Sequence, residues 1–136
     1  MREMNPYLIF NGNCGEAMTF YQKCLKAELK MSPFSEMPGP PIPGSEGRII
    51  NAHLKKGKAI LMASDNMPGM KFNAGDNFFV SINCETEKEV DEYYAALKEG
   101  GEAITPPQKM FWGDYFGMLR DKFGVAWMMT VPSTHS

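Results

Sequence analysis

MFWGDYFGMLRDKFGVAW, residues 110–127, decides the fold of this chain of 136 residues. Its aromatic and apolar residues fall into two short runs separated by the turn sequence DKFG, which predicts a β-hairpin over residues 115–120 and 125–131. Residues 48–54 and 58–64, joined by Lys55-Lys56-Gly57, form a weaker counterpart in the first half. The repeated hairpin indicates a duplicated unit.

Each expected hairpin is preceded by a strand, an amphipathic helix and a further strand. In the first half the strands are expected at 6–10 and 29–34, with helically spaced apolar residues from Ala17 to Leu25 between them. In the second half the strands are expected at 77–83 and 102–105, and Thr86 and Glu89 have the spacing of a capping box. Asn13 and Glu16 have the same spacing at the first helix. The sequence therefore predicts an α+β fold of tandem βαβββ modules.

The expected modules span residues 1–64 and 77–131 of a single domain covering 1–136, with a Gly-, Pro- and Asn-rich linker at 65–76. A module with one sheet and one helix cannot bury itself well alone, so the two are expected to combine into a curved mixed sheet around a cavity. Residues 35–47, crowded with proline and glycine, are expected to be a long loop that acts as a lid, forms a dimer contact or is simply mobile.

Charge and composition exclude several classes of partner. The formal net charge is -2 and the basic residues are scattered, which argues against a nucleic-acid partner. No segment has the apolar length of a membrane span, and the N-terminus lacks the apolar run of a signal peptide. Three cysteines without regular spacing favour a reducing compartment. We therefore expect a cytoplasmic protein without a membrane partner.

Strand alternation predicts an apolar, methionine-rich cavity wall suited to a small, partly apolar molecule. Trp127 is expected in the core beneath the helix, and Trp112 on the wall or rim. The residues expected to bind the ligand are Leu8, Phe10, Met62, Ser64, Asn77, Phe79, Trp112 and Met128.

Phe20-Tyr21 on the first expected helix occurs together with the segments PYLIF (6–10), SEMP (35–38), AHL (52–54), LMASD (61–65), FWG (111–113) and DKFGVAWM (121–128). This combination resembles the PhnB-like proteins of the vicinal oxygen chelate superfamily, which includes glyoxalases, extradiol dioxygenases and antibiotic-resistance proteins. The PhnB-like branch is often labelled 3-demethylubiquinone methyltransferase-like. One departure is Lys26, where the family usually has glycine at the helix end.

The resemblance implies a fold with four ligand positions for a divalent metal in the metal-dependent members of the superfamily. Those positions fall on Pro6, Met62, Asn77 and Met128, none of which is a usual ligand for such an ion. The chain has two histidines, His53 and His135, and His135 lies next to the C-terminus. We therefore expect neither a metal site nor another cofactor; a metal that bound anyway would have to use His53 with carboxylates.

His53 is the candidate catalytic residue, since imidazole titrates near neutrality, although a structural histidine fits the pattern as well. Cys24 is expected in the core. Cys14 is expected at a helix N-terminus, where the helix dipole lowers a thiol pKa, but no histidine is placed to activate it.

Three functions remain open: a metal-free protein that binds a small molecule, an isomerase, lyase or transferase that uses His53, and a non-catalytic structural or regulatory dimer. Related proteins often pair or swap modules across subunits, so the resemblance implies a homodimer. The methyltransferase label has no counterpart in the sequence, because the chain lacks a glycine-rich strand-to-helix turn and a doubly wound pattern.

Overall fold

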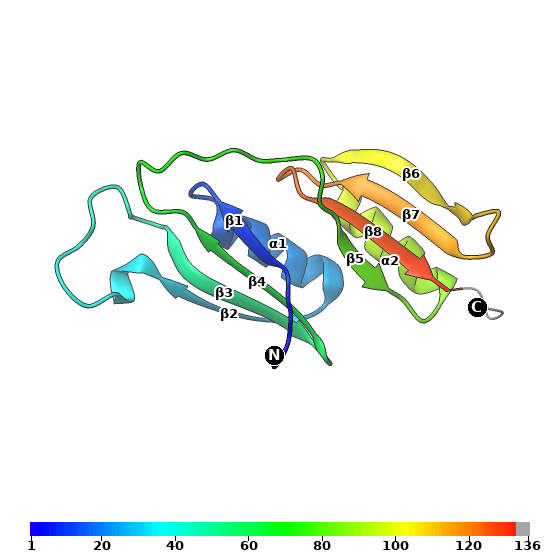
Figure 1. Ribbon diagram of the computed structural model, residues 1–136, viewed down its shortest axis with the longest axis horizontal. Helices are drawn as coiled ribbons and strands as arrows, with labels where there is room; N and C mark the ends of the chain where they lie inside the picture. The colour runs from blue at the N-terminus through cyan, green and yellow to red at the C-terminus, as the bar shows by residue number, and fades with distance from the viewer. Residues whose placement is uncertain (133–136) are drawn as a thin grey trace. The chain divides into compact units, whose positions relative to one another are not determined.

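The computed structural model describes residues 1–132 and shows two compact units, the first from Met1 to Asn73 and the second beginning at Ala74. Each unit contains a four-stranded mixed sheet and one α-helix (Figure 1). The tandem βαβββ architecture predicted from the sequence is thereby confirmed. The unit boundary after Asn73 falls inside the linker expected at 65–76.

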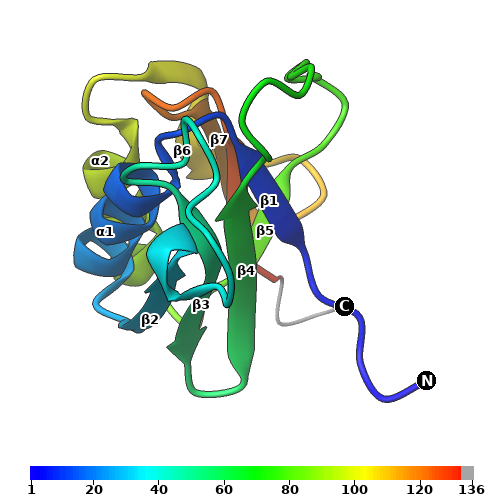
Figure 2. The same cartoon turned by 90° about the vertical axis from the view of Figure 1, so that its left-hand side faces the viewer.

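The first unit contains β1 (Tyr7–Phe10), α1 (Cys14–Leu25), β2 (Glu28–Pro33), β3 (Ile49–Lys56) and β4 (Ala59–Asp65). Its sheet has the order β1-β4-β3-β2, with β1 parallel to β4 and the other pairs antiparallel (Figure 2). A short 3-10 helix, η1 (Phe34–Glu36), begins the long loop after β2.

The second unit repeats this order with β5 (Val80–Asn83), α2 (Glu87–Lys98), β6 (Glu102–Lys109), β7 (Tyr115–Arg120) and β8 (Ala126–Val131). Its sheet has the order β5-β8-β7-β6, with β5 parallel to β8. The β7–β8 hairpin lies where the sequence predicts it. In contrast, β5 begins at Val80 rather than at residue 77, and β6 runs to Lys109 through Pro106 and Pro107. Proline has no N–H to donate, and β6 is an edge strand with register shifts at this point, so the sheet tolerates both rings.

Each helix covers one face of its own sheet. The core of each unit lies between its helix and its sheet. In the first unit α1 contacts β2, β3 and β4, and alternate residues of β3 and β4 are buried beneath it. In the second unit Leu119, Trp127 and Met129 are at most 1% exposed on the face that α2 covers. The expectation that Trp127 belongs to the core is confirmed.

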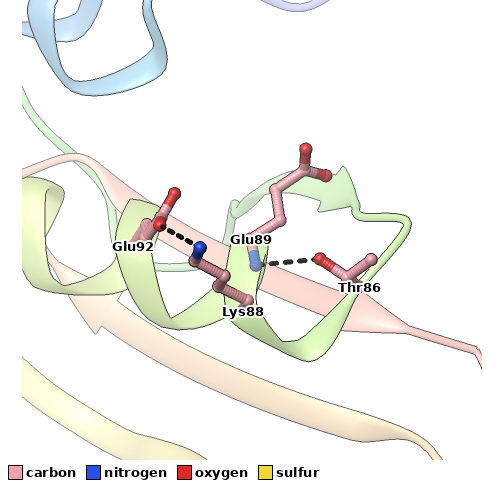
Figure 3. Close-up of polar contacts among 4 residues, drawn as sticks. All are labelled: Thr86, Lys88, Glu89 and Glu92. Atoms are coloured by element: carbon pink, nitrogen blue, oxygen red, sulfur yellow. Dashed lines mark hydrogen bonds and ion pairs between the residues drawn. The ribbon is translucent and has the colours of Figure 1, made fainter.

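The helix starts show one correct and one wrong prediction. At α2, the Thr86 side chain accepts a hydrogen bond from the Glu89 backbone N–H (3.1 Å), as a capping box requires (Figure 3). At α1, the Asn13 side chain makes no cap hydrogen bond. Instead, the carboxylate of Asp65 at the end of β4 accepts hydrogen bonds from the backbone N–H groups of Gly12 (2.7 Å) and Cys14 (3.0 Å).

In the described part of the chain, neither helix has the length and apolarity needed to cross a lipid bilayer.

Candidate functional site

The face of each sheet opposite its helix carries partly exposed side chains. In the first unit, Ala52, Leu54, Leu61 and Ala63 are buried under α1, so the side chains that alternate with them belong to the other face. We call this surface the open face of the first unit. The sheet register assigns to it Tyr7, Ile9, Glu28, Lys30, Ser32, Asn51, His53, Lys55, Ile60, Met62 and Ser64.

One row of this open face crosses all four strands. Lys30 of β2 pairs with His53 of β3, His53 pairs with Met62 of β4, and Met62 pairs with Tyr7 of β1. An ammonium, an imidazole, a thioether and a phenol therefore lie side by side. The thioether supplies an apolar, polarizable contact, and the other three groups can form hydrogen bonds with polar atoms of a ligand. His53 is exposed on this face, which the sequence left open.

The residues of β1 that the sequence predicts to bind the ligand, Leu8 and Phe10, lie on the opposite face. Leu8 and Phe10 pair with Ala63 and Asp65, and Phe10 is 3% exposed on the side that α1 covers. The open face instead receives Tyr7 and Ile9, which are 46% and 48% exposed. The prediction that Leu8 and Phe10 face the same side as Met62 was therefore wrong, because the alternation expected for β1 was shifted by one residue. In a strand, a shift of one residue moves every side chain to the opposite face. Met62 and Ser64 lie on the open face, although Ser64 is only 7% exposed.

The open face of the second unit has the same construction. Met128 of β8 pairs with Met118 of β7 and Ser81 of β5, while α2 covers the opposite face. Met128 and Met118 are partly exposed, so thioethers occupy the middle of this surface. The open face of the second unit consists of Ser81, Asn83, Glu102, Thr105, Gln108, Phe116, Met118, Arg120, Ala126, Met128 and Thr130.

Two further predicted wall residues precede the first strand of this sheet. Asn77 and Phe79 lie before β5, so strand alternation does not decide where their side chains point. Asn77 is exposed and Phe79 is partly buried.

Trp112 lies in the loop between β6 and β7 and is 48% exposed. Its indole N–H donates a hydrogen bond to Asp114 (3.2 Å), and its ring meets that of Phe116 with centroids 6.1 Å apart. Because Phe116 belongs to the open face of the second unit, Trp112 lies at the rim of that face.

The side chains at the metal positions of the superfamily do not fit a hard divalent ion. Met62 and Met128 present thioethers, Asn77 lies outside a strand, and Pro6 has no donor atom in its side chain. Tyr7 pairs with Met62 across β1 and β4 and presents a phenol. Among residues 1–132, no three side chains of His, Cys, Asp or Glu gather in an arrangement able to hold a metal. His135 lies outside the described residues.

The cysteines are placed for packing. Cys14 is fully buried at the start of α1, and burial, together with the neighbouring Asp65 carboxylate, raises the pKa of its thiol to about 12. Burial and then Glu89 raise the pKa of Cys84 to about 12. The helix dipole therefore does not activate Cys14. Cys24, expected in the core, is only partly buried.

The proline-rich loop encloses a cavity of its own, of about 190 Å³. Phe34, Met37 and Ile42 contribute apolar walls. Arg48 closes the loop by donating hydrogen bonds to the side-chain oxygen (2.6 Å) and the carbonyl oxygen (3.1 Å) of Asn66. These bonds tie the end of the loop to the segment after β4.

Comparison with solved structures supports the fold and the relationship. A protein of Pseudomonas aeruginosa, PA1353, is 38% identical, and the similarity covers 98% of this chain and 99% of that chain with a TM-score of 0.88. A putative 3-demethylubiquinone-9 3-methyltransferase, the PhnB protein of Bacillus cereus, is 29% identical over 96% and 100% of the two chains, with a TM-score of 0.79.

The fold extends to more distant proteins. A glyoxalase/bleomycin resistance protein/dioxygenase family enzyme of Burkholderia phytofirmans has a TM-score of 0.65 at 15% identity, over 92% of this chain and 94% of that chain. The model of the 3-demethylubiquinone-9 3-methyltransferase family matches residues 2–130. The chain therefore belongs to this family, and it shares its fold with glyoxalase/bleomycin resistance proteins.

Proposed function

We propose that this protein binds a small, partly apolar molecule on the open faces of its sheets, without the divalent metal of its metal-dependent relatives. The observation that carries the proposal is the exposure of large apolar side chains there, above all Tyr7 and Ile9. Such side chains at the surface mark contact with a ligand or a partner. Met62, Met118 and Met128 add flexible thioethers, which adapt to the shape of a ligand.

A few polar groups would fix the orientation of the ligand. On the open face of the first unit these are His53, Lys30 and the Tyr7 phenol, all in one row with Met62. On the second unit Arg120 has the corresponding role; its guanidinium donates a hydrogen bond to the Gly124 carbonyl oxygen (2.7 Å) and retains further donors. A mainly apolar surface with few convergent polar groups is typical of small-molecule sites.

Methyl transfer from a nucleotide-like cofactor has no support in the strand-to-helix turns. The turn from β1 to α1 contains one glycine, and the N–H groups of Gly12 and Cys14 both donate to Asp65. They are therefore not available to cradle a phosphate or carboxylate of a cofactor. Each sheet is a four-stranded mixed sheet with a helix on one face, whereas the folds that hold such cofactors are doubly wound.

The proposal is tested by a thermal-shift screen of apolar and aromatic metabolites and antibiotics, followed by calorimetric titration of each stabilising compound. A ligand specific for the folded state raises the melting temperature. Replacing Ile9 or Met62 by Ala should weaken binding about tenfold, because each replacement removes apolar contact area. Glu16→Ala, on the exposed side of α1, is the matched control. Equal affinities of all three variants would contradict binding on the open face.

Elemental analysis of the purified protein tests the metal-free part of the proposal separately. We expect less than stoichiometric divalent metal. One ion per chain, lost in His53→Ala, would contradict it.

A second candidate is an isomerase, lyase or transferase that uses His53. The exposure of His53 in the middle of a row with Lys30 and Met62 favours it, since a general base must reach its substrate. If His53 only orients the ligand, His53→Ala should change affinity by no more than a few-fold. The enzyme hypothesis would be favoured if the wild type turns over a substrate, His53→Ala abolishes this turnover and His53→Gln does not restore it.

We also propose that the protein is a cytoplasmic homodimer. Exposed Phe78 (82%) and Phe111 (97%) support a partner surface, and the three cysteines, all free, suit a reducing compartment. Sedimentation should give twice the 15.3 kDa chain mass; a monomer at all concentrations would contradict the dimer. A dimer that responds to no compound in the screen would favour the third candidate, a non-catalytic structural or regulatory dimer.

A further inference from the structure

One end of the first unit carries a concentrated positive charge around an open pocket. The β3–β4 turn meets the start of β2 and the end of α1 there, and the pocket has a volume of about 350 Å³. We call it the lysine pocket. It is lined by Lys26, Ala27, Glu28, Lys55, Lys56 and Gly57.

Lys26 has an unusual backbone conformation at this pocket. It caps the C-terminus of α1 with φ 54° and ψ 50°, and among the described residues other than glycine it alone has a positive φ. Glycine adopts this left-handed conformation freely, whereas a β-carbon makes it unfavourable. A lysine therefore carries a conformational cost at a position where glycine would form the same cap.

One of the three lysine ammonium groups of the pocket is hydrogen-bonded to the end of α1. Lys56 donates a hydrogen bond to the carbonyl oxygen of Leu25 (2.7 Å), which satisfies a free carbonyl of the last helical turn. Within residues 1–132, the ammonium groups of Lys26 and Lys55 have neither a hydrogen bond nor an ion pair. Glu28, the register partner of Lys55, is the one carboxylate in the lining. The lining therefore has a net positive charge, and Lys23 and Lys58 lie close by in the sequence.

From this geometry we propose that the lysine pocket binds a small, multiply charged anion of the polyphosphate class. Lysine ammonium groups act as point charges toward phosphate oxygens, and several of them around one hollow favour an anion with several charges over a single carboxylate. The chain as a whole has a net charge of -2, and the three lysines of this pocket form a local cluster at one end of the first unit. A nucleic-acid backbone would need a longer basic strip. Glu28 and Lys55 belong to the open face and are two residues along their strands from Lys30 and His53, whereas Lys26, Ala27, Lys56 and Gly57 lie outside that face. The proposal does not depend on the ligand proposed for the open face.

The test is calorimetric titration of the full chain with inorganic tripolyphosphate at low ionic strength. Lys26→Gly removes one ammonium and also relieves the backbone conformation, so the variant should bind about tenfold more weakly while its melting temperature stays the same or rises. Lys55→Ala should weaken binding similarly. Lys88→Ala, an equal loss of charge on the exposed surface of α2, should leave affinity within about twofold.

Three outcomes would overturn the proposal. The first is no binding of tripolyphosphate by the wild type. The second is an equal loss of affinity in Lys26→Gly and Lys88→Ala, which would show an effect of overall charge only. The third is a single-stranded oligonucleotide that binds more tightly than tripolyphosphate and loses affinity in Lys26→Gly, because that would identify a nucleic-acid surface.

Discussion

Asp65 is the residue on which most of the first unit's loop geometry depends. It is 4% exposed, and its carboxylate accepts hydrogen bonds from the backbone N–H groups of Gly12, Cys14 and Ile49 at 2.7–3.0 Å. One side chain thus joins the end of β4 to the start of α1 and the start of β3.

Asp65→Ala should lower the free energy of unfolding by about 3 to 5 kcal/mol, because it leaves three N–H groups without their acceptor. Asp65→Asn should cost less, since one amide oxygen can still accept the bonds from Gly12 and Cys14. Urea denaturation measures both, with the exposed Asp76→Ala as control. A cost of Asp65→Ala close to that of the control would show that water replaces the carboxylate.

Because of the two buried thiols, the free energy of unfolding should depend on pH in the alkaline range. The pKa values of Cys14 and Cys84 are raised from 9.0 to about 12, chiefly by burial. Above pH 9 the unfolded chain releases these protons while the folded chain keeps them. The stabilisation is therefore complete below pH 9 and is lost as the pH rises toward 12. Denaturation midpoints should stay level from pH 7 to 9 and then fall, and the fall should be smaller in Cys84→Ala.

At the scale of elements, the two helix starts look alike in sequence and differ in structure. Thr86 caps α2 through its own side chain and Asn13 does not cap α1. Thr86→Ala should therefore cost about 1 kcal/mol of unfolding free energy, and Asn13→Ala close to nothing. Thermal or urea unfolding of the pair provides the comparison; equal costs would mean that Asn13 caps α1 in solution.

Two glycines give opposite expectations for the same substitution. A β-carbon at Gly101, after α2, would collide with the backbone carbonyl oxygen of Arg120, whereas one at Gly15 in α1 would meet Ile49 at an ordinary 3.5 Å. Gly101→Ala should lower the free energy of unfolding by more than about 2 kcal/mol. Gly15→Ala should raise it by about 0.5 kcal/mol, because alanine favours the helix. Urea denaturation measures both, and a neutral Gly101→Ala would show that the backbone moves aside.

Local pattern predicted most elements because each signal lies within a few neighbouring residues. The β7–β8 hairpin follows from alternation and the Asp121–Gly124 turn, and the cap of α2 from the Thr86–Glu89 spacing. Local pattern failed at β5, where Asn77 and Phe79 alternate like strand residues but lie before Val80. β5 pairs with β8 from Val80 onward, and this pairing sets the start of β5.

At the scale of the whole molecule, the segment joining the two compact units is the expected point of attack by proteases. Lys71 is exposed and lies outside helices and strands. Trypsin should cut after Lys71 before it cuts after Lys56 or Lys58, whose hairpin is held by the β3–β4 ladder. Mass spectrometry of early digests identifies the cut, and a first cut in the hairpin would contradict the expectation. Cleavage after Arg2, near the terminus, does not bear on it.

The sequence by itself determined the order and type of the elements, the duplicated module and the family, because hydrophobic period, turn residues and family motifs are local. Only the tertiary structure decided that Tyr7 and Ile9 rather than Leu8 and Phe10 join Met62 on the open face. It also decided that the side chain of Asp65, 51 residues along the chain from Cys14, rather than that of Asn13 accepts the hydrogen bond at the start of α1. Both depend on the register between β1 and β4, which the packing of buried side chains across the whole sheet fixes.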